Sequence, residues 1–328
     1  MRRAVIRGTG ASLPERLLTN ADLEKMVDTS DEWITARTGI RERRIAASDE
    51  YLSQFATRAA REALRAAGLD GRDVELIICA TVTPDMPFPA AACIVQENLG
   101  ASGGAAFDLA AGCTGFIYGL GVADRFLATG VYRNAVLIGA ELLSKFVDWE
   151  DRSTCVLFGD GAGAVVLTPG EGPEGVLATA MRSDGRMADF IYLPAGGSRE
   201  PASERTVAGR RHFIRMRGNE TFKMAVRSIE EASREVLERA GLEPSDIGLF
   251  IPHQANRRII DAVGARLGLR PEQVYVNIER VGNTSSASIP IALDEAVRKG
   301  LVHRGDNLLF AAFGTGLTWG AALCRWGG

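Results

Sequence analysis

Cys113 and His253 are residue types that could take part in nucleophilic catalysis. Cys113 lies in the stretch 110–116, between a predicted strand and a predicted helix. A thiol at a helix start faces the positive end of the helix and free backbone amides, which favour the nucleophilic thiolate. Taken alone, Cys113 is equally compatible with a small buried cysteine of the core.

His253 follows the apolar run 249–251, which predicts a buried strand. Ligand sites of α/β folds gather at the carboxyl ends of strands, so this position favours a functional role. The other two histidines, His212 and His303, lie in charged surroundings and are predicted to be solvent-exposed. His253 is therefore the candidate that could assist a cysteine nucleophile.

An internal repeat adds a third residue to this pair. Ala67-Gly68-Leu69 and Ala240-Gly241-Leu242 each end a predicted amphipathic helix and precede a buried strand. Further along each copy, Cys113 and Asn283 each lie at the start of a second helix, 17 residues before the glycine that closes it. Symmetry thus places two polar groups at equivalent buried helix starts, which indicates a shared site.

The alternation of strands and helices predicts two α/β halves, residues 1–170 with Cys113 and residues 171–328 with His253 and Asn283. The helices after Cys113 and Asn283 are rich in small and apolar residues, so both are expected to be buried. Packed together, they would form the middle of a five-layered α-β-α-β-α sandwich. We expect Pro290 to kink the second helix unless local packing compensates. The polar segment 196–211 is predicted to be a surface loop.

Composition excludes several other classes of protein. The net charge of −3 and the pI near 5.8 provide no positive field for nucleic acid. The five cysteines lack CxxC spacing, so a disulfide framework or a zinc site is not expected. Neither a signal peptide nor a membrane span is apparent, which predicts a cytoplasmic protein. The glycines at 159–163 precede a strand rather than a helix, which disfavours a dinucleotide site.

With these residues in these positions, the chain closely resembles the β-ketoacyl-acyl-carrier-protein synthase III family, which has the thiolase fold. The resemblance extends over nearly the whole chain, from Asp28–Ile34 to Leu317–Gly320. The strongest motifs are Ala111–Phe116, Phe158–Gly163, His253–Asn256 and Gly282–Ser285. Elongating relatives have a second histidine where this chain has Asn283, so the resemblance implies the initiating type of condensing enzyme. Thr315 departs from the family pattern, in which glycine is usual.

The resemblance implies a reaction and its partners. The enzyme would condense a short acyl-coenzyme A with malonyl-acyl carrier protein through an acyl-Cys113 intermediate, as a homodimer and without a metal or cofactor. His253 and Asn283 would stabilise the enolate formed by decarboxylation, and the N–H groups of Cys113 and Thr315 would form the oxyanion hole.

The resemblance also assigns the binding residues. Trp33 and Arg152 would sandwich the adenine of coenzyme A, with Arg37 near the phosphates. The pantetheine tunnel would be lined by Gly218, Phe222, Ala255 and Asn256. The carrier protein would contact the segment Gln254, Ala255, Asn256, Arg257 and Arg258. Phe88 would reach the acyl pocket of the partner subunit and close its end.

Three rival functions are considered. A biosynthetic thiolase needs a second catalytic cysteine, and Cys324 lies in the last predicted strand, in the wrong place for one. A non-enzymatic interaction protein would typically have lost the nucleophile. A starter-unit ketosynthase or acyltransferase of a polyketide or related pathway shares the Cys/His/Asn set and stays the open alternative.

Overall fold

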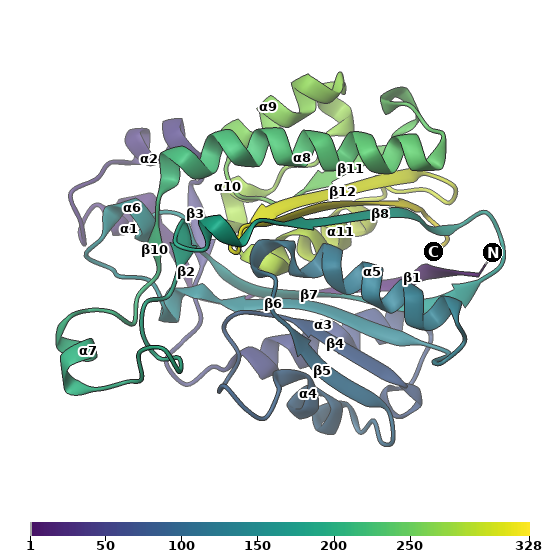
Figure 1. The fold of residues 1–328 in the computed structure, drawn as a ribbon, viewed down its shortest axis with the longest axis horizontal. Helices are drawn as coiled ribbons and strands as arrows, with labels where there is room; N and C mark the ends of the chain where they lie inside the picture. The colour runs from purple at the N-terminus through teal and green to yellow at the C-terminus, as the bar shows by residue number, and fades with distance from the viewer. Residues whose placement is uncertain (1) are drawn as a thin grey trace.

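Two β-sheets with helices between them and on both outer faces form the chain in the computed structural model (Figure 1). The structure describes residues 2–328, apart from the side chain of Asn219. The first sheet has the strand order β1 (Arg3–Ser12), β7 (Asp160–Gly170), β6 (Ala135–Leu142), β4 (Leu76–Ala80) and β5 (Ala105–Leu109). The second has the order β11 (Leu249–Pro252), β12 (Asn307–Gly314), β13 (Thr318–Arg325) and β8 (Gly175–Ser183).

The five predicted layers are present. Helices α5 (Gly115–Ala128) and α11 (Ser288–Arg298) lie between the sheets, α3 (Leu52–Ala67) and α4 (Ala91–Leu99) cover the first sheet, and α8 (Gly218–Ala240) and α9 (Arg257–Leu267) cover the second (Figure 1). A single buried cluster joins α5, α11 and both sheets. This confirms the thiolase-like sandwich, and it makes the middle layer the place where the two halves of the chain meet.

Close packing in the middle layer depends on side-chain size. The edge of the Phe116 ring on α5 meets the Phe310 ring on β12, with 6.1 Å between ring centroids. On the other sheet, a Cβ added to Gly139 would lie 2.3 Å from the backbone oxygen of Ser286. Only glycine lets the chain before α11 approach the first sheet this closely.

Pro290 falls in the first turn of α11, because the helix begins at Ser288 after the 3-10 turn Ser285–Ala287. The N–H groups of a first helical turn have no acceptor within the helix, so proline is tolerated there. The prediction that Pro290 lies in mid-helix and kinks it is therefore corrected: Pro290 lies in the first turn.

The repeat is also less complete than the sequence suggested. In the repeat, Val276–Ile278 corresponds to Phe107–Leu109 of β5, but Ile278 begins the short helix α10 (Ile278–Val281). Only an isolated bridge between Phe250 and Val274 takes the place of a fifth strand.

The remaining elements surround one end of the sandwich (Figure 1). They are β2 (Leu17–Thr19), β3 (Glu42–Arg44), α1 (Asn20–Leu23), α2 (Asp31–Thr38), α6 (Arg152–Cys155), β9 (Ile191–Tyr192), β10 (Arg215–Met216) and α7 (Glu204–Ala208). Helix α7 lies within the segment predicted as an irregular loop. Among the described residues, no helix has the length and apolar character needed to cross a bilayer.

Candidate active site

Cys113 lies at the start of the central helix α5, in the 3-10 turn Gly112–Thr114. The first N–H groups of such a turn lack acceptors within it, so they can bind an oxyanion. The end of β12 faces this turn: a Cβ added to Gly314 would lie 2.7 Å from the Cys113 backbone nitrogen. The nucleophile predicted from the first half is thus in contact with the second half.

His253 follows β11 and is 2 % exposed. Its Nδ1 lies 2.6 Å from the Ser288 hydroxyl oxygen. Burial lowers the pKa of the ring to about 3, so the imidazole is neutral at physiological pH. A neutral imidazole can donate one hydrogen bond without carrying a positive charge into the site.

The Asn283 side chain is fixed by a hydrogen bond to its carbonyl oxygen. Its Oδ1 accepts a hydrogen bond from the Ser285 backbone N–H at 2.9 Å. Ser285 has a φ of 49°, in the left-handed region that non-glycine residues rarely adopt. With Oδ1 engaged, the amide NH₂ of Asn283 remains as the donor group.

Two cavities meet at Cys113. The larger, about 690 Å³, is lined by Cys113, His253 and Asn283, together with Arg37 and Arg258 near the surface. The structure therefore brings the three residues predicted as the catalytic set to one cavity. We call this cavity the tunnel.

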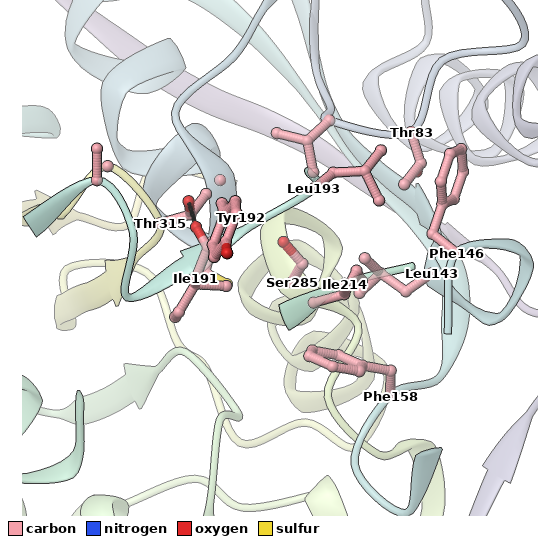
Figure 2. Close-up of a pocket in the computed structure, with 15 residues that line it drawn as sticks. Thr83, Leu143, Phe146, Phe158, Ile191, Tyr192, Leu193, Ile214, Ser285 and Thr315 are labelled. Carbon is pink, nitrogen blue, oxygen red and sulfur yellow. Dashed lines mark hydrogen bonds between the residues drawn. The ribbon is translucent and has the colours of Figure 1, made fainter. Parts of the chain in front are cut away.

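The smaller cavity, about 380 Å³, is almost entirely apolar, and we call it the apolar pocket. Figure 2 shows its walls on both sides of Ser285, with Ile191, Tyr192 and Thr315 on one side and Leu143, Phe146 and Phe158 on the other. Cys113 is also part of its lining. A short hydrocarbon chain bound to the Cys113 sulfur would fit there away from water.

The protonation of Cys113 differs from the sequence-based expectation. Burial raises the pKa of its thiol to about 11, although a hydrogen bond with Ser285 acts in the opposite direction. Loss of hydration outweighs the favourable amide contacts of the helix start. We therefore revise the expected thiolate: in the resting protein, Cys113 is a neutral thiol.

Glu141 is a buried acid beside this site that the sequence analysis missed. It accepts hydrogen bonds from the hydroxyls of Thr83 at 2.6 Å and Ser286 at 3.1 Å. Burial raises the pKa of Glu141 to about 7, and these hydrogen bonds limit the rise. Its contacts tie the β4 and α11 sides of the apolar pocket together.

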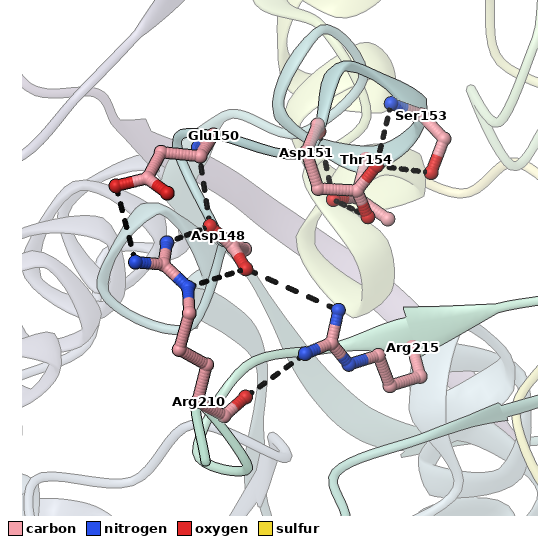
Figure 3. Close-up of polar contacts among 7 residues, drawn as sticks. All are labelled: Asp148, Glu150, Asp151, Ser153, Thr154, Arg210 and Arg215. Carbon is pink, nitrogen blue, oxygen red and sulfur yellow. Dashed lines mark hydrogen bonds and ion pairs between the residues drawn. The ribbon is translucent and has the colours of Figure 1, made fainter. Parts of the chain in front are cut away.

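A second buried acid, Asp148, fastens the outer wall of the apolar pocket. Asp148 is 6 % exposed and lies between Arg210 and Arg215 (Figure 3). Arg210 Nε donates to its Oδ2 at 3.2 Å, and the Arg210 hydrogen bond is the main cause of the lowered pKa of Asp148. The Ile214 N–H donates to the Phe146 carbonyl at 2.9 Å, so the two joined segments both supply side chains to the pocket lining.

Comparison with known proteins identifies the family. The family model described as 3-oxoacyl-[acyl-carrier-protein (ACP)] synthase III matches residues 107–185, and the model of the C-terminal part of the same synthase matches residues 237–326. A β-ketoacyl-[acyl-carrier-protein] synthase III of Caldanaerobacter subterraneus subsp. tengcongensis is 57 % identical over 98 % of both chains. The chain belongs to the β-ketoacyl-[acyl-carrier-protein] synthase III family.

Solved structures agree with this membership. The 3-oxoacyl-[acyl-carrier-protein] synthase III of Aquifex aeolicus matches with a TM-score of 0.91 at 54 % identity, over 98 % of this chain and all of that one. A priming β-ketosynthase from the R1128 polyketide pathway matches with a TM-score of 0.92 at 35 % identity, over 98 % and 96 % of the two chains. As a synthase III family member, the chain is an acyl-transferring condensing enzyme.

The residues that the synthase III resemblance assigned to coenzyme A lie in two groups. Arg37, Phe222, Ala255 and Asn256 line the tunnel, as does Gly218. Trp33 lies outside that lining, where the guanidinium carbons of Arg37 and Arg152 approach its ring centroid to 4.6 and 5.1 Å. An adenine between Trp33 and Arg152 would have to displace the Arg152 contact, so the sandwich stays a prediction.

Gln254 does not lie where the resemblance placed it, which was in the contact with the carrier protein. It is 0 % exposed, and its amide binds the backbone of Pro252, Tyr275, Asn277 and Ile278. A residue with no exposed surface cannot touch a docking protein, so its predicted role is revised to holding the backbone behind His253. Arg257 and Arg258 remain exposed on α9.

Phe88 is 84 % exposed and lines neither cavity of its own chain. Its predicted role in the partner's acyl pocket stays a prediction. Thr315 does lie beside the nucleophile: its backbone nitrogen would be 3.1 Å from a Cβ added to Gly112. The Thr315 hydroxyl donates to the Ile191 carbonyl, so its side chain fixes a wall of the apolar pocket instead of entering the tunnel.

Sequence reasoning missed most of the supporting residues. Ser285 was recognised only as a small residue of a buried helix and Ser288 was not singled out, although both form hydrogen bonds with the predicted catalytic set. Asp148 and Glu141 had no motif to mark them. The signal available for Ser288 was a hydroxyl within a helix start that was predicted to be buried, because a buried hydroxyl needs a partner.

Proposed function

We propose that this synthase III family member forms the first carbon–carbon bond of a fatty acyl chain. The observation that carries the proposal is the position of Cys113, where the apolar pocket meets the tunnel lined by His253 and Asn283. This arrangement suits a reaction that first stores an apolar acyl group on sulfur. It then generates a negative charge within reach of two neutral donors.

In the first half-reaction, the Cys113 sulfur attacks the carbonyl of a short acyl-coenzyme A, and the thiol proton ends on the departing coenzyme A thiolate. The N–H groups of Cys113 and Thr315 hold the tetrahedral oxyanion, which collapses to acyl-Cys113 with loss of the coenzyme A thiolate. Because the resting thiol is neutral, deprotonation accompanies the attack and no standing thiolate is required. The acyl chain then occupies the apolar pocket.

In the second half-reaction, a malonyl thioester enters the tunnel and loses carbon dioxide. The electron pair of the broken carbon–carbon bond forms an enolate, whose oxygen accepts hydrogen bonds from His253 and Asn283. The enolate carbon attacks acyl-Cys113, and the sulfur leaves as the β-ketoacyl thioester forms. Release of carbon dioxide drives the step, so the proposed reaction calls for no metal or cofactor.

The second substrate is proposed to be malonyl-acyl carrier protein. Carrier proteins are acidic, and Arg257 and Arg258 are exposed near the tunnel opening. Arg258 lies over Phe222 with 5.3 Å between guanidinium and ring centroid, so its charge faces the path of the incoming pantetheine. Arg257 is paired with Asp261 at 2.7 Å, which leaves Arg258 as the stronger candidate contact.

We further propose a homodimer in which Phe88 of each subunit closes the acyl pocket of the other. An aromatic side chain that is 84 % exposed on a proline-flanked segment suits burial in a partner. Phe88→Thr should then extend the range of accepted primers toward longer chains. An unchanged chain-length profile in a dimeric Phe88→Thr variant would remove Phe88 from the pocket.

The deciding assay combines purified protein with acetyl-coenzyme A and malonyl-acyl carrier protein. We expect release of carbon dioxide and an acetoacetyl-carrier product in equal amounts. Acyl transfer to the carrier protein without carbon–carbon bond formation would instead favour a starter-unit acyltransferase. Malonyl-coenzyme A in place of the carrier-bound substrate tests whether the carrier itself is recognised.

A further inference from the structure

The Ser288 hydroxyl has two polar neighbours that together fix the direction of its hydrogen bonds. The Gln254 backbone N–H points to Ser288 Oγ at 3.3 Å, and an N–H can only donate. The second neighbour is His253 Nδ1 at 2.6 Å. Among residues 2–328, the Ser288 hydroxyl has no other hydrogen-bond acceptor than this ring nitrogen.

A hydroxyl has one hydrogen to donate, and a buried donor is nearly always satisfied. Ser288 is 1 % exposed, so no solvent is available to take that hydrogen. It must therefore point to His253 Nδ1, which can accept it only if Nδ1 carries no proton. A neutral imidazole with a bare Nδ1 carries its proton on Nε2.

We infer that Ser288 is a positioning residue that holds His253 in the Nε2–H tautomer, with this N–H directed into the tunnel. The inference rests on the proposed function, because it assigns the tautomer to the step in which an enolate oxygen is stabilised. His253 Nε2 has no hydrogen-bond partner within the described chain, and His253 lines the tunnel. The ring is thereby a donor at Nε2 and cannot take a proton there from Cys113.

One segment then prepares both donors. Within residues 283–288, the Ser285 N–H occupies Asn283 Oδ1, and the Ser288 hydroxyl occupies His253 Nδ1. In both cases the accepting atom is satisfied from behind, which leaves the donating N–H for the substrate. Preorganised donors of this kind need no reorientation when the charge develops.

The inference is tested first without any substrate. The full-length protein is labelled with ¹⁵N-histidine, and long-range ¹H–¹⁵N spectra are recorded between pH 6 and 8. Only three histidines are present, so a His253→Ala spectrum assigns the signal. We expect a protonated Nε2 and an unprotonated Nδ1 for His253, without titration in this range. A protonated Nδ1 in the wild type would overturn the inference.

The second arm uses Ser288→Ala, with Ser286→Ala as the matched control. Ser286 is an equally buried hydroxyl that lies 2.8 Å from the Ala80 carbonyl oxygen and 3.1 Å from Glu141 Oε1, and it does not contact His253. Ser288→Ala should lose the single tautomer and slow condensation on acyl-enzyme by about 10-fold, while self-acylation changes less than about 2-fold. Ser286→Ala should retain the tautomer, and Ser288→Thr should restore it.

An unchanged tautomer and condensation rate in Ser288→Ala would refute the role of Ser288. If Ser288→Ala fails to fold, the wild-type spectrum still decides the tautomer, and loss of the Nε2–H tautomer in Ser288→Thr, which keeps a hydroxyl, would refute the role of that hydroxyl. The spectrum requires no reaction, so the predicted tautomer in a protein without condensing activity would refute the proposed function alone.

Discussion

The two central helices start in equivalent places and prepare opposite kinds of chemistry. The start of α5 carries Cys113, beside the apolar pocket and with a thiol whose pKa is raised by burial. The segment leading into α11 carries Asn283 and orients His253 through a hydrogen-bond network. In the proposed mechanism, the first half therefore stores the acyl group, and the second half supplies donors for a developing negative charge.

The strands that lead into these helices differ as well. In the first half, β5 pairs with β4 up to Leu109 and brings the chain to Cys113. In the second half, only the Phe250–Val274 bridge remains, and the freed backbone at Asn277 is bonded by Gln254 instead. The duplicated scaffold is thus altered at one edge, where a buried amide supports the backbone behind His253.

Removal of the nucleophile is expected to have the largest effect. Cys113→Ala should abolish both self-acylation and condensation, because the acyl group then has no sulfur to bond to. Intact-mass measurement after incubation with acetyl-coenzyme A should show an added acetyl group on the wild type only. Acetylation of the Cys113→Ala variant would place the acyl site elsewhere.

The pH dependence of Cys113 alkylation tests the difference in environment between the two halves. With a pKa raised to about 11, the thiolate fraction should grow about 10-fold per pH unit from pH 8 to 10. Alkylation by iodoacetamide, followed at the Cys113 peptide by mass spectrometry, should rise accordingly. A plateau already reached near pH 7 would show that the helix start stabilises the thiolate despite burial.

Charge reversal at the tunnel opening should have a moderate effect. Arg258→Glu is expected to raise KM for malonyl-acyl carrier protein about 10-fold at low salt, with little change in the use of acyl-coenzyme A. The difference should shrink as ionic strength increases. Arg266→Glu is the control, because Arg266 lies in the last turn of α9 and pairs with Glu230. Equal damage with both substrates would show that Arg258 acts in the shared tunnel or in folding rather than in docking of the carrier protein.

Loosening the outer wall of the apolar pocket should have the smallest effect. Asp148→Asn weakens the attachment to Arg210 and Arg215, so the Phe146 and Ile214 walls should spread. We expect a shift of about 2- to 5-fold in kcat/KM toward longer acyl primers. Glu150→Gln is the matched control, because Glu150 also pairs with Arg210, at 3.1 Å, but is 77 % exposed. The same shift in both variants would contradict a special role for the buried acid.

The sequence predicted those elements whose pattern is local. Helix α3 and strand β4 lie almost where periodicity and apolar runs placed them, and the Cys/His/Asn set was found from the repeat and the resemblance. The short helix α10 was missed because it forms where a strand was expected. There the buried Gln254 side chain, rather than a neighbouring strand, bonds the backbone, and no local sequence pattern records such a contact. The division of the chain at residue 170 stays a prediction.

The missing parts of the site have a common physical cause. The apolar pocket is assembled from separate loops, such as those carrying Phe146, Tyr192 and Ile214, whose residues meet only in the fold. Burial also raised the pKa of Cys113 and removed Gln254 from the surface that a carrier protein could touch. Burial is a property of the whole structure. For Cys113, the loss of hydration on burial raised the thiol pKa, although the position at a helix start had predicted a thiolate.

The division of labour between the two helix starts is tested most directly by measuring the two half-reactions separately. Wild type, His253→Ala and Asn283→Ala are mixed rapidly with acetyl-coenzyme A, and acyl-Cys113 is quantified by intact mass. The pre-acylated proteins are then given malonyl-acyl carrier protein. We predict near wild-type acylation and a loss of about 100- to 1,000-fold in condensation for both variants. Near wild-type condensation together with failed acylation would contradict the account.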